Sequence, residues 1–138
     1  MSAELTVRHL GGDRFAIDVR GHTIMVDQPT EAGGEDTAPT PTELFIAGLA
    51  SCVAFYARRY LARHDIPADG LAVTSTFTMA TKPGRVSDIA IEITPPAALP
   101  AERRDAFRAV ASHCTVHNTL EQAPAVEIRL GAGVAARG

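Results

Sequence analysis

The chain has 138 residues, a length that fits a single domain over residues 1–138 and excludes two ordinary ones. Its 46% hydrophobic and 21% charged residues are typical of a globular protein and exclude a disordered one. The net charge of −3 argues against a nucleic-acid partner, because proteins that bind nucleic acid usually carry a basic face.

The first third of the chain predicts a β-meander. Residues Leu5–Leu10, Phe15–Val19 and His22–Asp27 carry apolar residues at alternating positions, and glycine-containing turns separate them. A polar loop over Gln28–Pro39 follows, and a loop of that length in a compact domain is often functional. No basic stretch followed by an apolar stretch opens the chain, so we expect no secretory signal and a cytoplasmic location.

The sequence Thr-Pro-Thr-Glu at residues 40–43 predicts the start of a long helix that runs to about His64. It fits a capping box, in which Glu43 reaches back to the N-cap Thr40. The helix is apolar on every face over Leu44–Tyr56, so we expect it to be buried all round. In a chain this small, a homodimer is the economical way to supply that cover. The apolar run is too short to cross a bilayer, so we expect no membrane partner.

The second half of the chain predicts a hairpin, two helices and a last strand. The hairpin strands are Leu71–Ala80 and Val86–Thr94, the helices are Pro100–Ala111 and Val116–Gln122, and the last strand is Ala125–Leu130. The resulting order, β-β-β-α-β-β-α-α-β, is an α+β arrangement. We expect residues 131–138 to form a frayed tail.

The chain has only two cysteines, which leaves one redox pair or two free thiols to consider. Cys52 lies in the apolar helix, where it is either an inert core residue or a shielded nucleophile. A nucleophile there needs a nearby cation, because apolar surroundings alone raise the pKa of a thiol. Cys114 precedes the short helix, whose free N–H groups favour a thiolate, although an inert buried thiol is an equal alternative.

The polar residues near the cysteines have ordinary explanations beside functional ones. His113 and His117 flank Cys114, but a metal site needs three or four convergent ligands and no typical ligand spacing completes one, so we expect no metal. Glu43 is explained by its capping role and lies on nearly the opposite side of the helix from Cys52.

Two early arginines lie near turn ends. Arg14 and Arg20 are typical of solvated strand residues. An arginine placed beside a thiol would lower the pKa of that thiol and bind a peroxide oxygen.

Five motifs in order resemble the OsmC/Ohr family of osmotically induced and organic hydroperoxide resistance proteins. They are Asp-Gln-Pro at 27–29, Gly-Gly at 33–34, Pro-Thr-Pro-Thr-Glu-Leu at 39–44, Ala-Gly-Leu-Ala-Ser-Cys at 47–52, and His-Cys-Thr-Val-His-Asn-Thr-Leu at 113–120. The resemblance covers nearly the whole chain. It implies an OsmC-like fold with a long buried central helix, assembled as an intertwined homodimer.

The same resemblance implies a thiol-dependent peroxidase that needs no bound cofactor. Cys52 would attack an organic hydroperoxide and become a sulfenic acid, and Cys114 would then form a disulfide with it. A dithiol reductant, such as a lipoyl protein, would reduce that disulfide by exchange. The other implied site residues are Glu43 and Arg14 as activating groups, with Phe45, Leu49, Phe55 and Arg20 in the substrate pocket.

Two other function classes fit the same residues. One is a module that binds a small lipophilic or acyl ligand, with the cysteines as pocket lining. The other is different cysteine chemistry, either a thiol redox sensor or acyl transfer with a nearby histidine as base. A cation near Cys52, with Cys114 within disulfide reach, favours the peroxidase.

Overall fold

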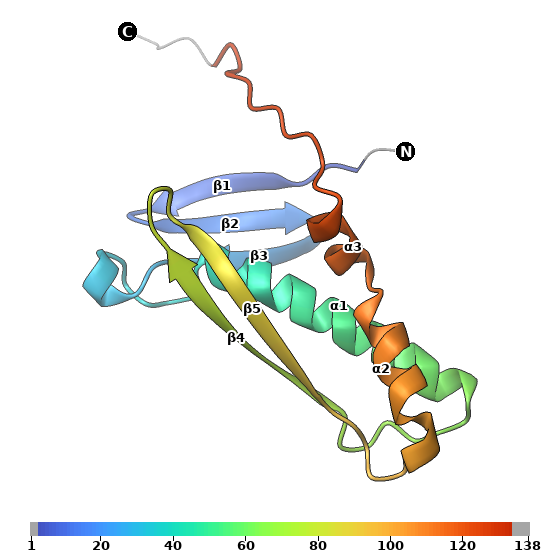
Figure 1. Ribbon diagram of the computed structural model, residues 1–138. Helices are drawn as coiled ribbons and strands as arrows, with labels where there is room; N and C mark the ends of the chain where they lie inside the picture. The colour runs from blue at the N-terminus through green and yellow to red at the C-terminus, as the bar shows by residue number, and fades with distance from the viewer. Residues whose placement is uncertain (1–2, 134–138) are drawn as a thin grey trace, which may run out of the picture.

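A computed structural model describes residues 3–133 of the chain (Figure 1). Every predicted element except the last strand is confirmed, with ends that shift by a few residues. The elements are β1 (Thr6–Gly11), β2 (Arg14–Val19), β3 (His22–Val26), η1 (Thr30–Ala32), α1 (Pro41–Arg63), β4 (Ala72–Ala80), β5 (Arg85–Thr94), η2 (Ala101–Arg103), α2 (Arg104–Ser112) and α3 (Thr115–Glu121).

The strands form two separate antiparallel sheets. One is the meander β1-β2-β3 and the other is the hairpin β4-β5. The hairpin packs with α2 and α3 along α1, while the meander lies beside the first half of α1 (Figure 1). The β2–β3 turn consists of Arg20 and Gly21, with φ angles of 48° and 81°. Two successive positive φ angles are typical of a tight type I′ hairpin turn, and they place Arg20 at an exposed tip.

Asp27, at the end of β3, organises the polar loop that leads to α1. Its side chain is only 1% exposed. The carboxylate accepts hydrogen bonds from the backbone N–H of Gln28 (2.7 Å) and from both the N–H (3.0 Å) and hydroxyl (2.6 Å) of Thr37. Its own N–H donates to the Pro39 carbonyl, 3.1 Å away. These bonds, the Thr37 hydroxyl first among them, lower the pKa of Asp27 to about 2.

Gly34 completes this loop because no side chain fits there. A Cβ atom at Gly34 would lie 2.1 Å from the Gln28 carbonyl oxygen, which is far inside van der Waals contact. Residues 28–39 therefore close tightly around Asp27 and deliver the chain to the first turn of α1.

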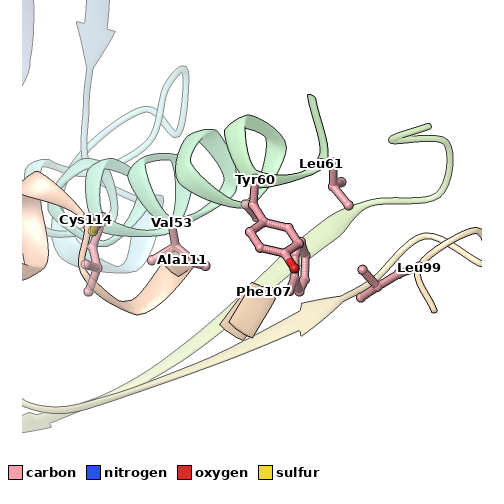
Figure 2. Packing of buried hydrophobic residues seen from close by; sticks show 9 residues of the cluster. Val53, Tyr60, Leu61, Leu99, Phe107, Ala111 and Cys114 are labelled. Carbon is pink, nitrogen blue, oxygen red and sulfur yellow. The ribbon is translucent and has the colours of Figure 1, made fainter. Parts of the chain in front are cut away.

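The predicted capping box begins α1. The Glu43 N–H donates to the Thr40 hydroxyl (3.1 Å), and the Thr40 N–H donates to the Glu43 carboxylate (2.8 Å). One side of the helix then packs against β4, β5, α2 and α3. Figure 2 shows this contact from close by, where Tyr60 meets Phe107 edge-to-face at 5.8 Å between ring centroids. The buried cluster comprises Leu49, Val53, Ala57, Tyr60, Leu61, Leu99, Phe107, Ala111 and Cys114.

Two predictions about α1 are revised by the structure. One concerns its length against a bilayer, and the other concerns its burial. The whole helix is longer than its most apolar run, and by length and composition alone it could cross a bilayer. Its contacts instead make it the core helix of this fold. Burial on every side is wrong for the single chain, because Phe45 is 44% and Phe55 is 54% exposed. One chain has too few elements to cover both faces of the helix.

The predicted strand at Ala125–Leu130 does not form. This segment leaves α3 without regular structure (Figure 1). Its apolar residues Val126, Ile128 and Leu130 alternate with polar ones in the sequence, but all three are exposed, at 78%, 92% and 101%. A strand also needs a neighbouring edge to pair with, and within residues 3–133 this segment has none. Residues 131–133 of the predicted frayed tail are also irregular, and the rest of it lies outside the described residues.

We expect the variant Asp27→Asn to lower the melting temperature by several degrees at neutral pH. The folded pKa of about 2 lies below the usual 3.8, so the carboxylate stabilises the fold above about pH 4 and loses this effect as the pH falls towards 2. The difference from the wild type should therefore shrink over that interval. Thermal scans from pH 7 to pH 2 measure it, with exposed Asp69→Asn as the control. Equal melting of Asp27→Asn and wild type at pH 7 would contradict this role.

Candidate active site

The fold brings the two cysteines together. Both are free thiols, and half-buried Cys52 of α1 packs against the cluster that contains Cys114. Cys114 has 0% exposure and lies between α2 and α3. In Figure 2 its sulfur points towards α1. One thiol is thus accessible and its neighbour is enclosed.

Cys114 is the N-cap of α3, as its position in the sequence predicts. Its sulfur accepts a hydrogen bond from the His117 N–H at 3.3 Å. That bond lowers the pKa of Cys114, but burial raises it more, so the pKa of this thiol is raised overall. The helix N–H groups therefore act on Cys114 in the expected direction, but desolvation outweighs them, so a thiolate is not favoured overall.

Cys52 adds to the raised pKa of Cys114. It acts both through a side-chain hydrogen bond and through its charge. Both effects have the sign expected for a neighbouring ionisable thiol, since a nearby negative charge disfavours ionisation of Cys114.

The histidines beside Cys114 face backbone carbonyls. His113 Nδ1 lies 2.7 Å from the Ala109 oxygen, and His117 Nδ1 lies 2.6 Å from the Ser112 oxygen. Because a carbonyl only accepts, each Nδ1 carries its hydrogen and is not a free base. Within residues 3–133, no group of three or more His, Cys, Asp or Glu side chains is arranged to hold a metal ion.

The two predicted activating residues have different surroundings. Glu43 is engaged in the cap with Thr40, while Cys52 lies more than two helical turns further along α1. Arg14, at the start of β2, is half-buried, and its Nε has no hydrogen-bond partner among the described residues. None of the hydrogen bonds described for residues 3–133 joins either of them to a cysteine.

The larger cavity, here called the apolar groove, has a volume of about 890 Å³ between α1, β5, α2 and α3. Two of the expected pocket residues, Phe45 and Leu49, line it together with other apolar residues and with charged side chains from β5, α2 and α3. Phe55 and Arg20 line neither this groove nor the smaller pocket described next. The cysteines do not line the groove either, although the adjoining Val53 and His117 do.

A smaller pocket of about 400 Å³, here called the basic pocket, lies where α1 meets the end of α2. The sequence analysis did not identify it. The available signal was spacing, because Tyr56 and Arg59 follow Cys52 on the same face of the helix. Its lining residues are Tyr56, Arg59, Arg63, Ala109, Val110 and His113.

Comparison with known proteins gives a family and a set of similar folds. The family model of OsmC-like proteins matches residues 33–129. No curated protein matches the chain. An osmotic stress induced and detoxification response protein from Psychrobacter arcticus is 27% identical, with a TM-score of 0.78 over 86% of this chain and 88% of that one.

Two further solved structures share the fold at lower identity. The organic hydroperoxide resistance protein OsmC from Legionella pneumophila is 22% identical, with a TM-score of 0.65 over 85% of this chain and 88% of that one. An organic hydroperoxide resistance protein from Vibrio cholerae, with captopril bound in one active site, is 19% identical, with a TM-score of 0.61 over 89% and 88%.

We expect iodoacetamide to modify Cys52 well before Cys114 in the folded, reduced protein, because Cys114 is enclosed and its pKa is raised. Peptide mass spectrometry over a time course measures both rates. In Cys52→Ser the pKa of Cys114 should fall, because the neighbouring ionisable group that raises it is removed. The unfolded chain serves as the control, in which both thiols should react alike. Faster modification of Cys114 in the folded protein would contradict this arrangement.

Proposed function

The chain belongs to the family of OsmC-like proteins, and from that premise we propose that it is a thiol-dependent peroxidase that reduces organic hydroperoxides. The carrying observation is the contact between a half-buried thiol, Cys52, and an enclosed one, Cys114. Relatives of the same fold are named organic hydroperoxide resistance proteins, which agrees with this substrate class.

The first step is oxidation of Cys52. Its thiolate attacks the terminal oxygen of the hydroperoxide, so that an S–O bond forms and the O–O bond breaks. The leaving alkoxide takes a proton and departs as an alcohol, and Cys52 becomes a sulfenic acid. The sulfur has lost two electrons, and the peroxide has gained them.

The second step uses Cys114. Its raised pKa keeps its proton in place while Cys52 is the thiolate. Once Cys52 is a sulfenic acid, Cys114 sulfur attacks the Cys52 sulfur, an S–S bond forms, and the hydroxyl leaves with the Cys114 proton as water. Direct contact of the two side chains suits this step.

An external dithiol then restores both thiols. We propose a dihydrolipoyl group, for example on a lipoyl protein, which supplies two electrons and two protons by thiol–disulfide exchange. No bound cofactor takes part in this cycle. A cytoplasmic location fits it, because thiols are kept reduced there between turnovers.

Arg14 and Glu43 remain our candidates for activating residues. The buried Nε of Arg14 has no partner within the described residues, and an unpaired buried donor is costly. A thiolate, a peroxide oxygen or the carboxylate of Glu43 would satisfy it. Because none of the hydrogen bonds described within one chain joins Arg14 to Cys52, we assign the contact between Arg14 and the thiol to the assembled dimer.

The exposed surface supports a homodimer. The chain exposes 10438 Å², whereas a compact monomer of 14.6 kDa exposes about 6,900 Å². Large apolar side chains account for part of the excess on the meander, the hairpin, α1 and the segment after α3. A second copy would cover the open face of α1 and offer a sheet edge to Val126–Leu130.

A second candidate function rests on the apolar groove. Its volume falls in the range of small-molecule sites, and neither cysteine lines it. The groove would suit a lipophilic or acyl ligand in a binding module without peroxidase chemistry.

We expect an excess of cumene hydroperoxide to consume both thiols of the reduced wild-type chain and to leave a Cys52–Cys114 disulfide. In Cys114→Ser the sulfenic acid at Cys52 should persist, because the resolving thiol is absent. In Cys52→Ser the peroxide should leave Cys114 reduced. Thiol counts and intact mass measure these outcomes. If Cys52 stays reduced under excess peroxide while a fatty acid binds, the binding module replaces the peroxidase.

We expect light scattering to give twice the chain mass of 14.6 kDa at micromolar concentration. Ile128→Asp should raise the monomer fraction, because it places a charge where the exposed apolar side of the segment would be covered. Glu127→Gln, on the alternate side of the same segment, is the matched control. A monodisperse wild-type monomer would contradict the dimer, and an unchanged Ile128→Asp dimer would remove this segment from the interface.

A further inference from the structure

The basic pocket has a lining suited to an anion. Two arginines, one histidine and one tyrosine provide its polar groups, and no carboxylate lines it. Arg59 and Arg63 are one helical turn apart, so both side chains reach the same side of α1. Neither forms a salt bridge with any described residue of the chain. Two cations without a counter-charge therefore share one small concave site.

Aromatic rings hold one of these cations in place. The Arg59 guanidinium carbon lies 5.6 Å from the centre of the Phe55 ring and 5.9 Å from that of the Tyr56 ring. Such stacking covers a face of the guanidinium group and leaves N–H donors at its edge available. A planar group fixed in this way is suited to a carboxylate, which it can bind with two parallel hydrogen bonds.

The opposite wall of the basic pocket supplies one more polar atom. His113 Nδ1 is committed to the Ala109 carbonyl at 2.7 Å, so Nε2 is the ring nitrogen left for a ligand. Val110 and Ala109 form an apolar surface beside it. The pocket thus combines charged donors with room for a short hydrocarbon.

The basic pocket adjoins the two thiols. The Tyr56 hydroxyl lies 2.8 Å from the Thr115 hydroxyl, and Thr115 follows Cys114 directly. Cys52 lies one helical turn before Tyr56, and Arg59 lies about 10 Å further along the helix axis than Cys52. A molecule of modest length could therefore reach both the arginines and the reactive sulfur.

We propose that the basic pocket binds the carboxylate of a molecule whose other end reacts at the Cys52–Cys114 pair. The inference rests on the proposed peroxidase function and adds a specificity site to it. The carboxylate could belong to the oxidant, as in a fatty acid hydroperoxide, or to the reductant when that reductant is free dihydrolipoate, since a protein-bound lipoyl group carries an amide in its place. Both present the same group to Arg59 and Arg63, and matched pairs of compounds separate them.

The experiment compares each acid with its neutral counterpart. The oxidants are linoleic acid hydroperoxide and its methyl ester, and the reductants are dihydrolipoate and dihydrolipoamide. For wild type we expect kcat/KM to favour the acid in at least one pair by about tenfold, and high salt to weaken that preference. In Arg59→Gln/Arg63→Gln the ratio should fall towards one, and the double lysine variant should recover part of it.

Arg58→Gln is the matched control, because Arg58 is exposed on α1 beside Arg59 and does not line the pocket. Its acid-to-neutral ratio should equal that of wild type. Loss of the preference in the oxidant pair assigns the carboxylate to the peroxide, and loss in the reductant pair assigns it to the dithiol. An unchanged ratio in both pairs for the folded double glutamine variant overturns the proposal.

Direct binding separates this inference from the peroxidase function. Titration of octanoate into the reduced protein, followed by NMR shifts at Arg59 and His113, requires no turnover. Octanoate should shift both signals in wild type, and the His113 signal should stay unshifted in Arg59→Gln/Arg63→Gln. Shifts in a wild type that reduces no peroxide would leave the anion site standing and remove the peroxidase. Absence of shifts in an active wild type would remove the site alone.

Discussion

The structure depends on one constraint: α1 carries more apolar surface than a single chain can cover. The capping box starts this helix without ambiguity, and packing against β4, β5, α2 and α3 buries one side of it. The opposite side keeps Phe45 and Phe55 about half exposed. This uncovered side of α1 is one reason why the chain exposes more surface than a compact monomer of its mass.

The two thiols differ in burial because they lie differently with respect to the covered side of α1. Cys52 lies at that boundary and is half-buried, whereas Cys114 lies within the cluster and is enclosed. Burial and the neighbouring Cys52 both raise the pKa of Cys114. The same packing that stabilises the fold therefore leaves one sulfur reachable and keeps the other protonated, which is the asymmetry that a two-step disulfide mechanism requires.

Local patterns predicted most of the elements, because they depend on neighbours in the chain. The Thr40–Glu43 box and the alternation of the hairpin strands each specify their own geometry, and both are confirmed. Sequence patterns gave a wrong prediction where secondary structure depends on a partner that is distant in the chain. Apolar and polar residues alternate over Ala125–Leu130, but no strand forms there, because pairing needs a neighbouring edge and within residues 3–133 none lies beside this segment.

The candidate site also has features that the sequence predicts and features that depend on residues distant in the chain. The positions of both cysteines could be read from the sequence, and so could the N-cap location of Cys114. The direction of the pKa shift at Cys114 could not be predicted, because the burial that raises it depends on packing against residues of α1, which is remote in sequence. Arg59 was missed for a related reason. It has no motif of its own, and its interest arises only when Phe55, Tyr56 and the end of α2 are in place around it.

The buried carboxylate of Asp27 connects the loop to the site. It binds the backbone of the loop that delivers the chain to Thr40, and Gly34 allows that loop to close. The N-terminus of α1 is thereby fixed relative to the β1–β3 meander, which carries Arg14 with its unpaired Nε. Because Cys52 lies on the same helix, the loop sets how the meander and the thiol-bearing helix are placed relative to each other. The loop motif and the cysteine motif are therefore parts of one arrangement, in which a carboxylate remote from the sulfur helps to position the helix that carries it.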